Sequence, residues 1–251
     1  MTLHENWEFD VIGIYNYRRG GVYKPMFDFI RDHHDGIDGD IVDVGVYKGK
    51  TTLGFAMYLK ELGSDKKVYG YDSFCGFPPD PNPMDAHERY EELFEEGRIS
   101  QAHWDAVRRY WETIGFLKEA SNLDQFTVST SADFSNTSQD FLERKIERLG
   151  LDNIVLVPGF FSDTMTADSG PEKIFFVNLD CDLYDGYKLS LPFVWDRMPT
   201  GGYIWLDEYY SLKFPGARIA TDEFFVDKAD GPEMDERLPG EFERWHVVRK
   251  S

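Results

Sequence analysis

The stretch Ile41-Val-Asp-Val-Gly-Val-Tyr-Lys-Gly-Lys-Thr51 decides the fold of this 251-residue chain. Its first two residues are apolar and suit a buried strand, and a helix-like segment begins near Thr52. The two glycines between them suit a tight turn. A strand, a glycine turn and a helix N-terminus bring backbone amides close to a ligand. We therefore expect a ligand to bind at this turn.

An acid further along the chain indicates which ligand. The run Val68-Tyr-Gly-Tyr71 leads into Asp72, and a carboxylate at the end of the second strand can hold ribose hydroxyls. A phosphate loop needs four residues between its first glycine and Gly-Lys-Thr, whereas Gly45 and Gly49 enclose three. The dinucleotide fingerprint needs glycine where Tyr47 stands. The pattern acidic-x-Gly-x-x-x-Gly is typical of S-adenosylmethionine (SAM) methyltransferases, and the alternative is a turn without a ligand.

Composition narrows the class of partner. Hydrophobic residues make up 41% of the chain and aromatic residues 16%, which suffices for a buried core and argues against disorder. The net charge of −19 repels polyanions, so we expect neither nucleic acid nor an anionic membrane as a partner.

The cysteines and the N-terminal residues indicate where in the cell the protein is expected. Cys75 and Cys181 do not form a disulfide framework, and we expect both to be reduced thiols. Residues 1–10 contain no apolar run, so we expect neither a signal peptide nor a membrane span there. These features predict a soluble, cytoplasmic protein.

Apolar runs alternate with helical patterns along the chain. The expected strands are 40–45, 67–72, 154–158, 174–179 and 203–206, with 244–248 as a closing edge strand. The expected helices are 25–35, 52–62, 138–149, 190–198 and 217–225, with Pro192 in the first turn of its helix. This alternation predicts an α/β fold with a doubly wound, mostly parallel sheet.

Two segments lie outside this alternation. Residues 1–36 form an N-terminal extension to a main domain of residues 37–251, and residues 73–125 form an insertion after the second strand. The insertion, which holds helical stretches at 87–97 and 104–116, either covers the cofactor site or is a surface excursion. Within the extension, the basic and aromatic residues 15–24 suit a diphosphate and a stacked base. A subunit interface or a solvated loop is the alternative for residues 15–24.

Acids follow two of the expected strands. Asp180 and Asp182 come after 174–179, and Asp207 and Glu208 come after 203–206. The carboxyl ends of parallel strands share one edge of a sheet, and like charges crowded there are costly unless compensated. Mg²⁺ or another divalent cation would compensate them. The alternative is that one or two of these acids cap the helices that follow.

Five segments together resemble the macrocin O-methyltransferase family, whose members are SAM- and Mg²⁺-dependent enzymes that methylate sugar hydroxyls in antibiotic biosynthesis. The segments are Asp43–Thr52, Tyr71–Pro78, Val157–Asp163, Asn178–Tyr184 and Gly201–Glu208, in the family's order. The resemblance covers roughly residues 35–227, and it implies the class I SAM-dependent methyltransferase (Rossmann-like) fold. A more distant likeness is to catechol O-methyltransferase.

The resemblance implies roles for individual residues. It implies that Asp180, Asp207 and Glu208 hold the metal, and that Asp182 is the general base or a residue that orients the ligands. The cofactor-binding residues that it implies are Asp43, Gly45, Val46, Tyr47, Gly49, Thr51, Asp72, Ser73, Phe74, Phe161, Ser162 and Asp180. Several family members have Asp where this chain has Glu208, so the contact of Glu208 with the metal is the least secure of these roles.

The expected activity is therefore SAM- and metal-dependent O-methylation of a sugar or nucleotide-sugar hydroxyl. TDP-rhamnose, of an enediyne pathway, is one candidate substrate by family association, and we expect a homo-oligomer. A catechol-type O-methyltransferase and a non-catalytic SAM-binding protein are the alternatives. The insertion and the tripeptide Asp182-Leu-Tyr184 favour the sugar family over the catechol type.

Overall fold

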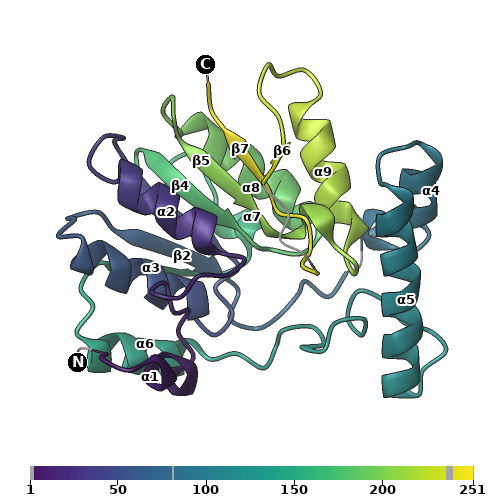
Figure 1. Ribbon diagram of the computed structural model, residues 1–251, viewed down its shortest axis with the longest axis horizontal. Helices are drawn as coiled ribbons and strands as arrows, with labels where there is room; N and C mark the ends of the chain where they lie inside the picture. The colour runs from purple at the N-terminus through teal and green to yellow at the C-terminus, as the bar shows by residue number, and fades with distance from the viewer. Residues whose placement is uncertain (1–2, 81, 236–239, 251) are drawn as a thin grey trace.

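The computed structural model describes residues 3–80, 82–235 and 240–250. Its centre is a seven-stranded sheet with the strand order β3-β2-β1-β4-β5-β7-β6 (Figure 1). The strands are β1 (Asp40–Val44), β2 (Val68–Asp72), β3 (Ile154–Pro158), β4 (Ile174–Leu179), β5 (Tyr203–Leu206), β6 (Glu233–Met234) and β7 (Trp245–Val248). β1 to β5 pair in parallel, whereas β7 is antiparallel to both β5 and β6. The expected α/β, mostly parallel sheet is confirmed.

Helices cover both faces of this sheet. The α-helices are α1 (Asn6–Ile12), α2 (Lys24–His33), α3 (Lys50–Glu61), α4 (Arg89–Glu95), α5 (Gln101–Lys118), α6 (Gln139–Leu149), α7 (Phe161–Thr164), α8 (Tyr184–Asp196) and α9 (Pro215–Phe225). Two short 3-10 helices, η1 (Pro83–Asp85) and η2 (Asp207–Tyr210), complete the set for the described residues. None of the helices in the described part of the chain is long and apolar enough to cross a bilayer.

The strands alternate between two apolar cores. Ile41 and Phe176 face a core that contains residues of α1, α2, α3 and α6. Val42 and Val177 face the opposite core, which contains residues of α8 and α9. All six residues of β4 are buried, as expected for a central parallel strand whose two faces are both covered. The two covered faces leave the strand ends as the place for a ligand.

Two expectations about elements are wrong. α8 begins at Tyr184 and not at residue 190, so Pro192 lies inside the helix and not in its first turn. The missed turns hold Asp185 and Lys188, polar residues that hid the start of the helix. Strand β7 is not an edge strand, because the two-residue strand β6 pairs with its outer side. Strand β6 has only two residues. That is too short for an alternation of apolar and polar residues, so the sequence gives no sign of this strand.

The two parts of the insertion at residues 73–125 lie in different places. Residues of its first part border the cavity described below, namely Gly76, Phe77, Pro78, Asp80, Asn82 and Asp85. Its helices α4 and α5 lie beside α9 (Figure 1), where Tyr90, Leu93 and Val107 share an apolar cluster with residues that follow β5. The insertion therefore contributes to the cavity through its loop, while its helices pack at the side of the sheet.

The basic and aromatic residues 15–24 take part in packing and ion pairs. The ring of Tyr17 packs against Tyr58, with 4.8 Å between centroids. Arg18 pairs with Glu61, Arg19 with Asp10 and Lys24 with Asp28. These ion pairs lie at the surface, and no residue of the segment lines the cavity at the strand ends, as far as the structure describes it. Diphosphate binding by this segment stays a prediction.

Candidate active site

A cavity of about 460 Å³ opens at the carboxyl ends of the parallel strands. Residues after β1, β2, β3 and β4 line it, together with the insertion loop and the N-terminal part of α8. In open α/β sheets this edge is where ligands bind. The cavity is therefore the candidate site.

The glycine turn after β1 forms one wall. Gly45 has φ +93, and a Cβ at this position would overlap the carbonyl oxygen of Asp180. Only glycine satisfies both the left-handed backbone and the close approach of the two strand ends. Tyr47, with φ +50, continues the turn and lines the cavity.

Asp72 stabilises the turn from the neighbouring strand. Its carboxylate accepts hydrogen bonds from the backbone N–H of Tyr47 at 2.8 Å and of Phe74 at 2.6 Å. Burial raises the pKa of Asp72 despite these bonds. The side chain lines the cavity, and a carboxylate has acceptor sites for further donors beyond these two.

Asp43 takes a different position. Its carboxylate is fully buried beneath the turn, where the hydroxyls of Thr51 and Thr52 donate to it at 2.8 and 2.5 Å and the Asn178 amide donates at 2.7 Å. Burial raises the pKa of Asp43 to about 6. Asp43 therefore joins β1, β4 and the start of α3, and it does not line the cavity.

The cofactor-binding residues expected from the sequence separate into two groups. Those that line the cavity are Gly45, Tyr47, Asp72, Ser73, Phe161, Ser162 and Asp180. Those that do not line it are Asp43, Val46, Gly49, Thr51 and Phe74, although Val46 and Gly49 belong to the turn between β1 and α3. Their direct contact with a cofactor stays a prediction.

Sequence reasoning missed much of the lining. The additional residues are Gly76, Phe77, Pro78, Asp80, Asn82, Asp85, Phe134, Gly159, Phe160, Cys181, Leu183, Asp185, Gly186, Lys188 and Leu189. The rule that ligands bind at strand ends could have indicated Gly159 and Phe160, which follow β3. No sequence signal marks Phe134, because the long loop before α6 brings it to the cavity.

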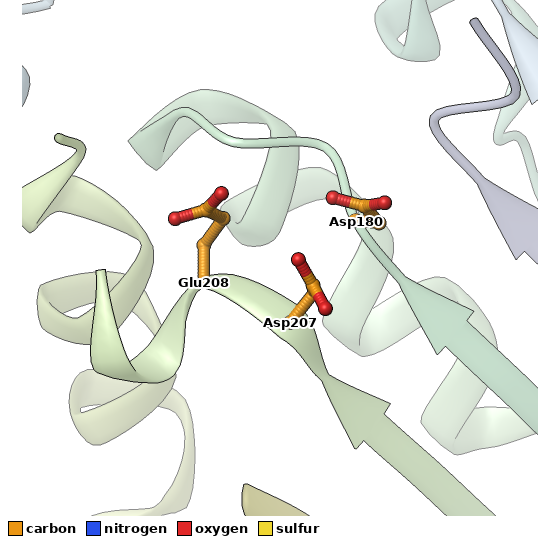
Figure 2. Close-up of side chains that lie close together, drawn as sticks. All are labelled: Asp180, Asp207 and Glu208. Carbon is orange, nitrogen blue, oxygen red and sulfur yellow. The ribbon is translucent and has the colours of Figure 1, made fainter. Parts of the chain in front are cut away.

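The acids after β4 and β5 do meet. Oxygen atoms of Asp180, Asp207 and Glu208 lie within 4.8 Å of one another. Figure 2 shows Asp180 on the loop after β4, with Asp207 and Glu208 after β5. The parallel pairing of β4 with β5 places these two loops side by side. The expectation of a carboxylate cluster at adjacent strand ends therefore holds in the structure, although Asp207 and Glu208 do not line the cavity of about 460 Å³.

Asp182 belongs to the same group of charges. It is 7% exposed and lines the cavity, its carboxyl group lies near that of Glu208, and its backbone has φ +62. Burial and the charge of Glu208 raise the pKa of Asp182 well above its usual range. Burial also raises the pKa of Asp180 well above its usual range, and so do the charges of the neighbouring acids, of which Asp207 has the largest effect.

Two cations lie beside the four carboxylates. The ammonium group of Lys213 is 3.1 Å from Oε1 of Glu208, and the guanidinium group of Arg244 is 3.4 Å from Oδ1 of Asp207. Burial alone would lower the pKa of Lys213, but Glu208 and Asp182 outweigh it and raise the pKa.

A divalent cation fits this donor set. If all four carboxylates are ionised, the two cations leave an excess of two negative charges, which a divalent cation would neutralise. Carboxylate oxygens are the donors that Mg²⁺ and Ca²⁺ prefer. The close grouping of three such side chains from two adjacent loops is thus consistent with a metal site.

The chain was compared with known proteins. The family model described as macrocin O-methyltransferase matches residues 28–126 and 118–230. Mycinamicin III 3''-O-methyltransferase of Micromonospora griseorubida is 27% identical over 197 residues, which are 76% of this chain and 61% of that protein. An 8-demethyl-8-(2,3-dimethoxy-alpha-L-rhamnosyl)-tetracenomycin-C 4'-O-methyltransferase of Streptomyces olivaceus is 25% identical over 177 residues, which are 70% of this chain and 54% of that protein. The chain thus spans about 54–61% of the length of these relatives.

Solved structures share the fold. The O-methyltransferase NovP superposes with a TM-score of 0.62 at 19% identity, covering 97% of this chain and 80% of that one. The calicheamicin methyltransferase CalS11 gives 0.59 at 17% identity, covering 90% and 76%. At these identities the likeness concerns the fold, and it confirms the expected class I methyltransferase architecture.

Proposed function

The chain belongs to the macrocin O-methyltransferase family, and from this premise we propose that it transfers the methyl group of SAM to a sugar hydroxyl in natural-product biosynthesis. The observation that carries the proposal is the meeting of Asp180, Asp207 and Glu208 next to a cavity that Asp72 and the glycine turn line. This arrangement combines a nucleoside site with a cluster of hard oxygen donors at one sheet edge.

SAM would occupy the part of the cavity nearest the turn. Asp72 would accept hydrogen bonds from the ribose hydroxyls, and Phe161 and Ser162 would contact the adenine. The methionine end would lie along Gly45 and Tyr47. The acidic residues of the cavity favour SAM electrostatically, because its sulfonium group is a cation.

Asp180, Asp207 and Glu208 would hold Mg²⁺ or another divalent cation. When bound there, such a cation would lower the pKa of an acceptor hydroxyl. Glu208 would use one carboxylate oxygen for this role, since Lys213 lies 3.1 Å from its Oε1.

Asp182 would take the proton of the acceptor hydroxyl. It lines the cavity two residues after Asp180, and burial raises its pKa, so the carboxylate binds a proton more readily than an exposed aspartate. Its left-handed backbone, φ +62, fixes the direction in which the side chain leaves the loop. A purely orienting role toward Glu208 is the alternative.

Two acceptor classes come from the compared proteins. One structure of CalS11 is described as a TDP-rhamnose 3'-O-methyltransferase, which would make a nucleotide-activated deoxysugar the acceptor here. The name of the relative from Streptomyces olivaceus describes a rhamnosyl group already attached to tetracenomycin C. Assembly into a homo-oligomer and a cytoplasmic location stay predictions.

Calorimetry tests the cofactor. Wild-type protein should bind S-adenosylhomocysteine, and Asp72→Ala should weaken this binding by at least tenfold. NADH and ATP should give no measurable heat. The control is Asp152→Ala, which removes an exposed acid that pairs only with Lys60 among the described contacts. Equal affinities of wild type and Asp72→Ala would refute the assignment of Asp72.

Transfer of a labelled methyl group tests the reaction. With TDP-rhamnose and p-nitrophenyl α-L-rhamnoside as acceptor probes, a chelator should abolish labelling, and added Mg²⁺ should restore it. Asp180→Asn and Asp207→Asn should each lose most of the activity while S-adenosylhomocysteine still binds. Full activity in chelator would mean that the reaction needs no metal at the carboxylate cluster. Cofactor binding without labelling of either probe would favour the non-catalytic alternative.

A further inference from the structure

Asp85 is an acid that the proposed chemistry does not use. It ends η1 in the insertion loop, is 2% exposed and lines the cavity. Its Oδ1 accepts the backbone N–H of Tyr184 at 2.9 Å. Gly216 of α9 lies so close that an added Cβ would overlap this oxygen. Three separate segments therefore hold the carboxyl group in one place.

The second oxygen of Asp85 has no partner. Oδ2 is buried and makes no hydrogen bond with the described residues. Leaving a buried polar atom unsatisfied costs about 1–3 kcal/mol. A hydroxyl or ammonium group of a ligand in the cavity would supply the missing donor.

The same contacts block the place where a phosphate would bind. The N-terminus of a long helix such as α8 presents free amides to an anion. Here Asp85 already accepts the amide of Tyr184, and Asp185 at the second position of α8 accepts the side-chain amide of Asn82 at 2.8 Å. An incoming diphosphate would therefore find the first amide of α8 occupied and would meet the carboxylates of Asp85 and Asp185 beside it.

The other charged residues of the cavity also disfavour a diphosphate. Six carboxylates line it: Asp72, Asp80, Asp85, Asp180, Asp182 and Asp185. Lys188 is the one lysine or arginine among the described lining residues, and its ammonium group is 3.1 Å from Glu223. Nucleotide diphosphates are normally held by arginine, lysine, free helix amides or Mg²⁺. Of the three proposed metal ligands, only Asp180 lines this cavity.

We propose that Asp85 receives a hydrogen-bond donor of the acceptor sugar, and that the acidic wall to which it belongs excludes acceptors carrying a diphosphate. This inference rests on the proposed methyltransferase function and selects within it an uncharged or cationic sugar. Asp85 is a specificity-determining residue in this scheme, and Asp182 remains the base.

The test compares two ligands on one protein. With wild-type enzyme saturated with S-adenosylhomocysteine and Mg²⁺, calorimetry measures the binding of p-nitrophenyl α-L-rhamnoside and of TDP. The rhamnoside should bind at least tenfold more tightly than TDP. Similar affinities, tighter binding of TDP, or binding of neither would overturn the proposal. Failure of S-adenosylhomocysteine itself to bind would instead refute the proposed function.

Variants test Asp85 itself. Asp85→Asn should weaken rhamnoside binding about tenfold and leave the affinity for S-adenosylhomocysteine unchanged. The control is Asp152→Asn, which makes the same substitution at an exposed acid that does not line the cavity and should change the rhamnoside affinity less than twofold. Unchanged rhamnoside binding in Asp85→Asn, or an equal loss of both ligands, would reduce Asp85 to a structural residue. The TDP comparison needs no variant, so it decides the charge argument even if Asp85→Asn does not fold.

Discussion

At the scale of single residues, acids of the same kind acquire different roles from their surroundings. Asp43 and Asp72 belong to adjacent parallel strands. Asp43 is enclosed by two threonine hydroxyls and an asparagine amide, whereas Asp72 accepts two backbone amides and lines the cavity. Asp43 therefore serves the stability of the fold, and Asp72 is available to a ligand.

Asp43 should make stability depend on pH. Its folded pKa is raised from 3.8 to about 6, so the folded state binds this proton more tightly than the unfolded state. This contribution to stability is present in full below about pH 4 and is lost as the pH rises to about 6, by roughly 3 kcal/mol. Asp43→Asn removes the titration.

Urea unfolding at pH 4, 5, 6 and 7 measures this effect. The free energy of unfolding of the wild type should fall relative to that of Asp43→Asn between pH 4 and 6, and the difference should be constant above. Other carboxylates titrate in both proteins and cancel in the comparison. A difference independent of pH would contradict the raised pKa.

Asp182→Asn tests the base while preserving shape. Loss of a general base lowers turnover by roughly 10²–10⁴, and the defect should shrink as rising pH ionises the acceptor hydroxyl without help. The measurement is kcat against pH, together with Mg²⁺ affinity, because Asp182 lies close to Glu208 and to the proposed metal site. Turnover near the wild-type value would leave Asp182 with an orienting role only.

At the scale of elements, the turn between β1 and α3 is set by a close approach of two strand ends. Gly45 and Gly63 both have left-handed backbones, with φ +93 and +70. Only Gly45 has a neighbour within reach of an added Cβ, the carbonyl group of Asp180. The two glycines therefore separate the cost of the backbone conformation from the cost of the contact.

Alanine at each glycine should show the difference. Gly63→Ala should cost about 1–2 kcal/mol of stability, the cost of the left-handed conformation, and should leave cofactor binding intact. Gly45→Ala should cost roughly 3 kcal/mol or more, since overpacking adds to that cost, and should abolish binding of S-adenosylhomocysteine. Thermal unfolding and calorimetry check both, and equal effects of the two substitutions would show that the contact with Asp180 is unimportant.

At the scale of the whole molecule, charge connects the site to global stability. The chain has a net charge of −19, and four of its carboxylates meet at one edge of the sheet with only Lys213 and Arg244 identified as paired cations there. Their mutual repulsion opposes folding. A divalent cation that binds the folded state alone should stabilise the entire protein.

Mg²⁺ should therefore raise the unfolding temperature. At 100 times its dissociation constant, a ligand that binds only the folded state contributes about 2.7 kcal/mol. For a chain of this size that corresponds to roughly 5–10 °C. Asp207→Asn should lose the shift, and Asp152→Asn should keep it. An equal shift in all three proteins would mean that Mg²⁺ screens the general surface charge and does not occupy the cluster.

The sequence by itself determined the parallel α/β sheet, the glycine turn and the meeting of the strand-end acids. Apolar runs and glycines report local backbone preferences, and parallel strands necessarily bring their carboxyl ends to one edge. A helix start among polar residues, as at Tyr184, and a two-residue strand, as at β6, carry no such periodic signal.

Only the tertiary structure decided which acids face the cavity. Asp43 turns toward two threonine hydroxyls and Asp72 toward the cavity because of side-chain packing, which the linear pattern does not contain. Asp85 lies 99 residues before its partner Tyr184, and Phe134 reaches the cavity from a long loop. Contacts between such distant residues form only when the whole chain has folded, so no local motif could indicate them.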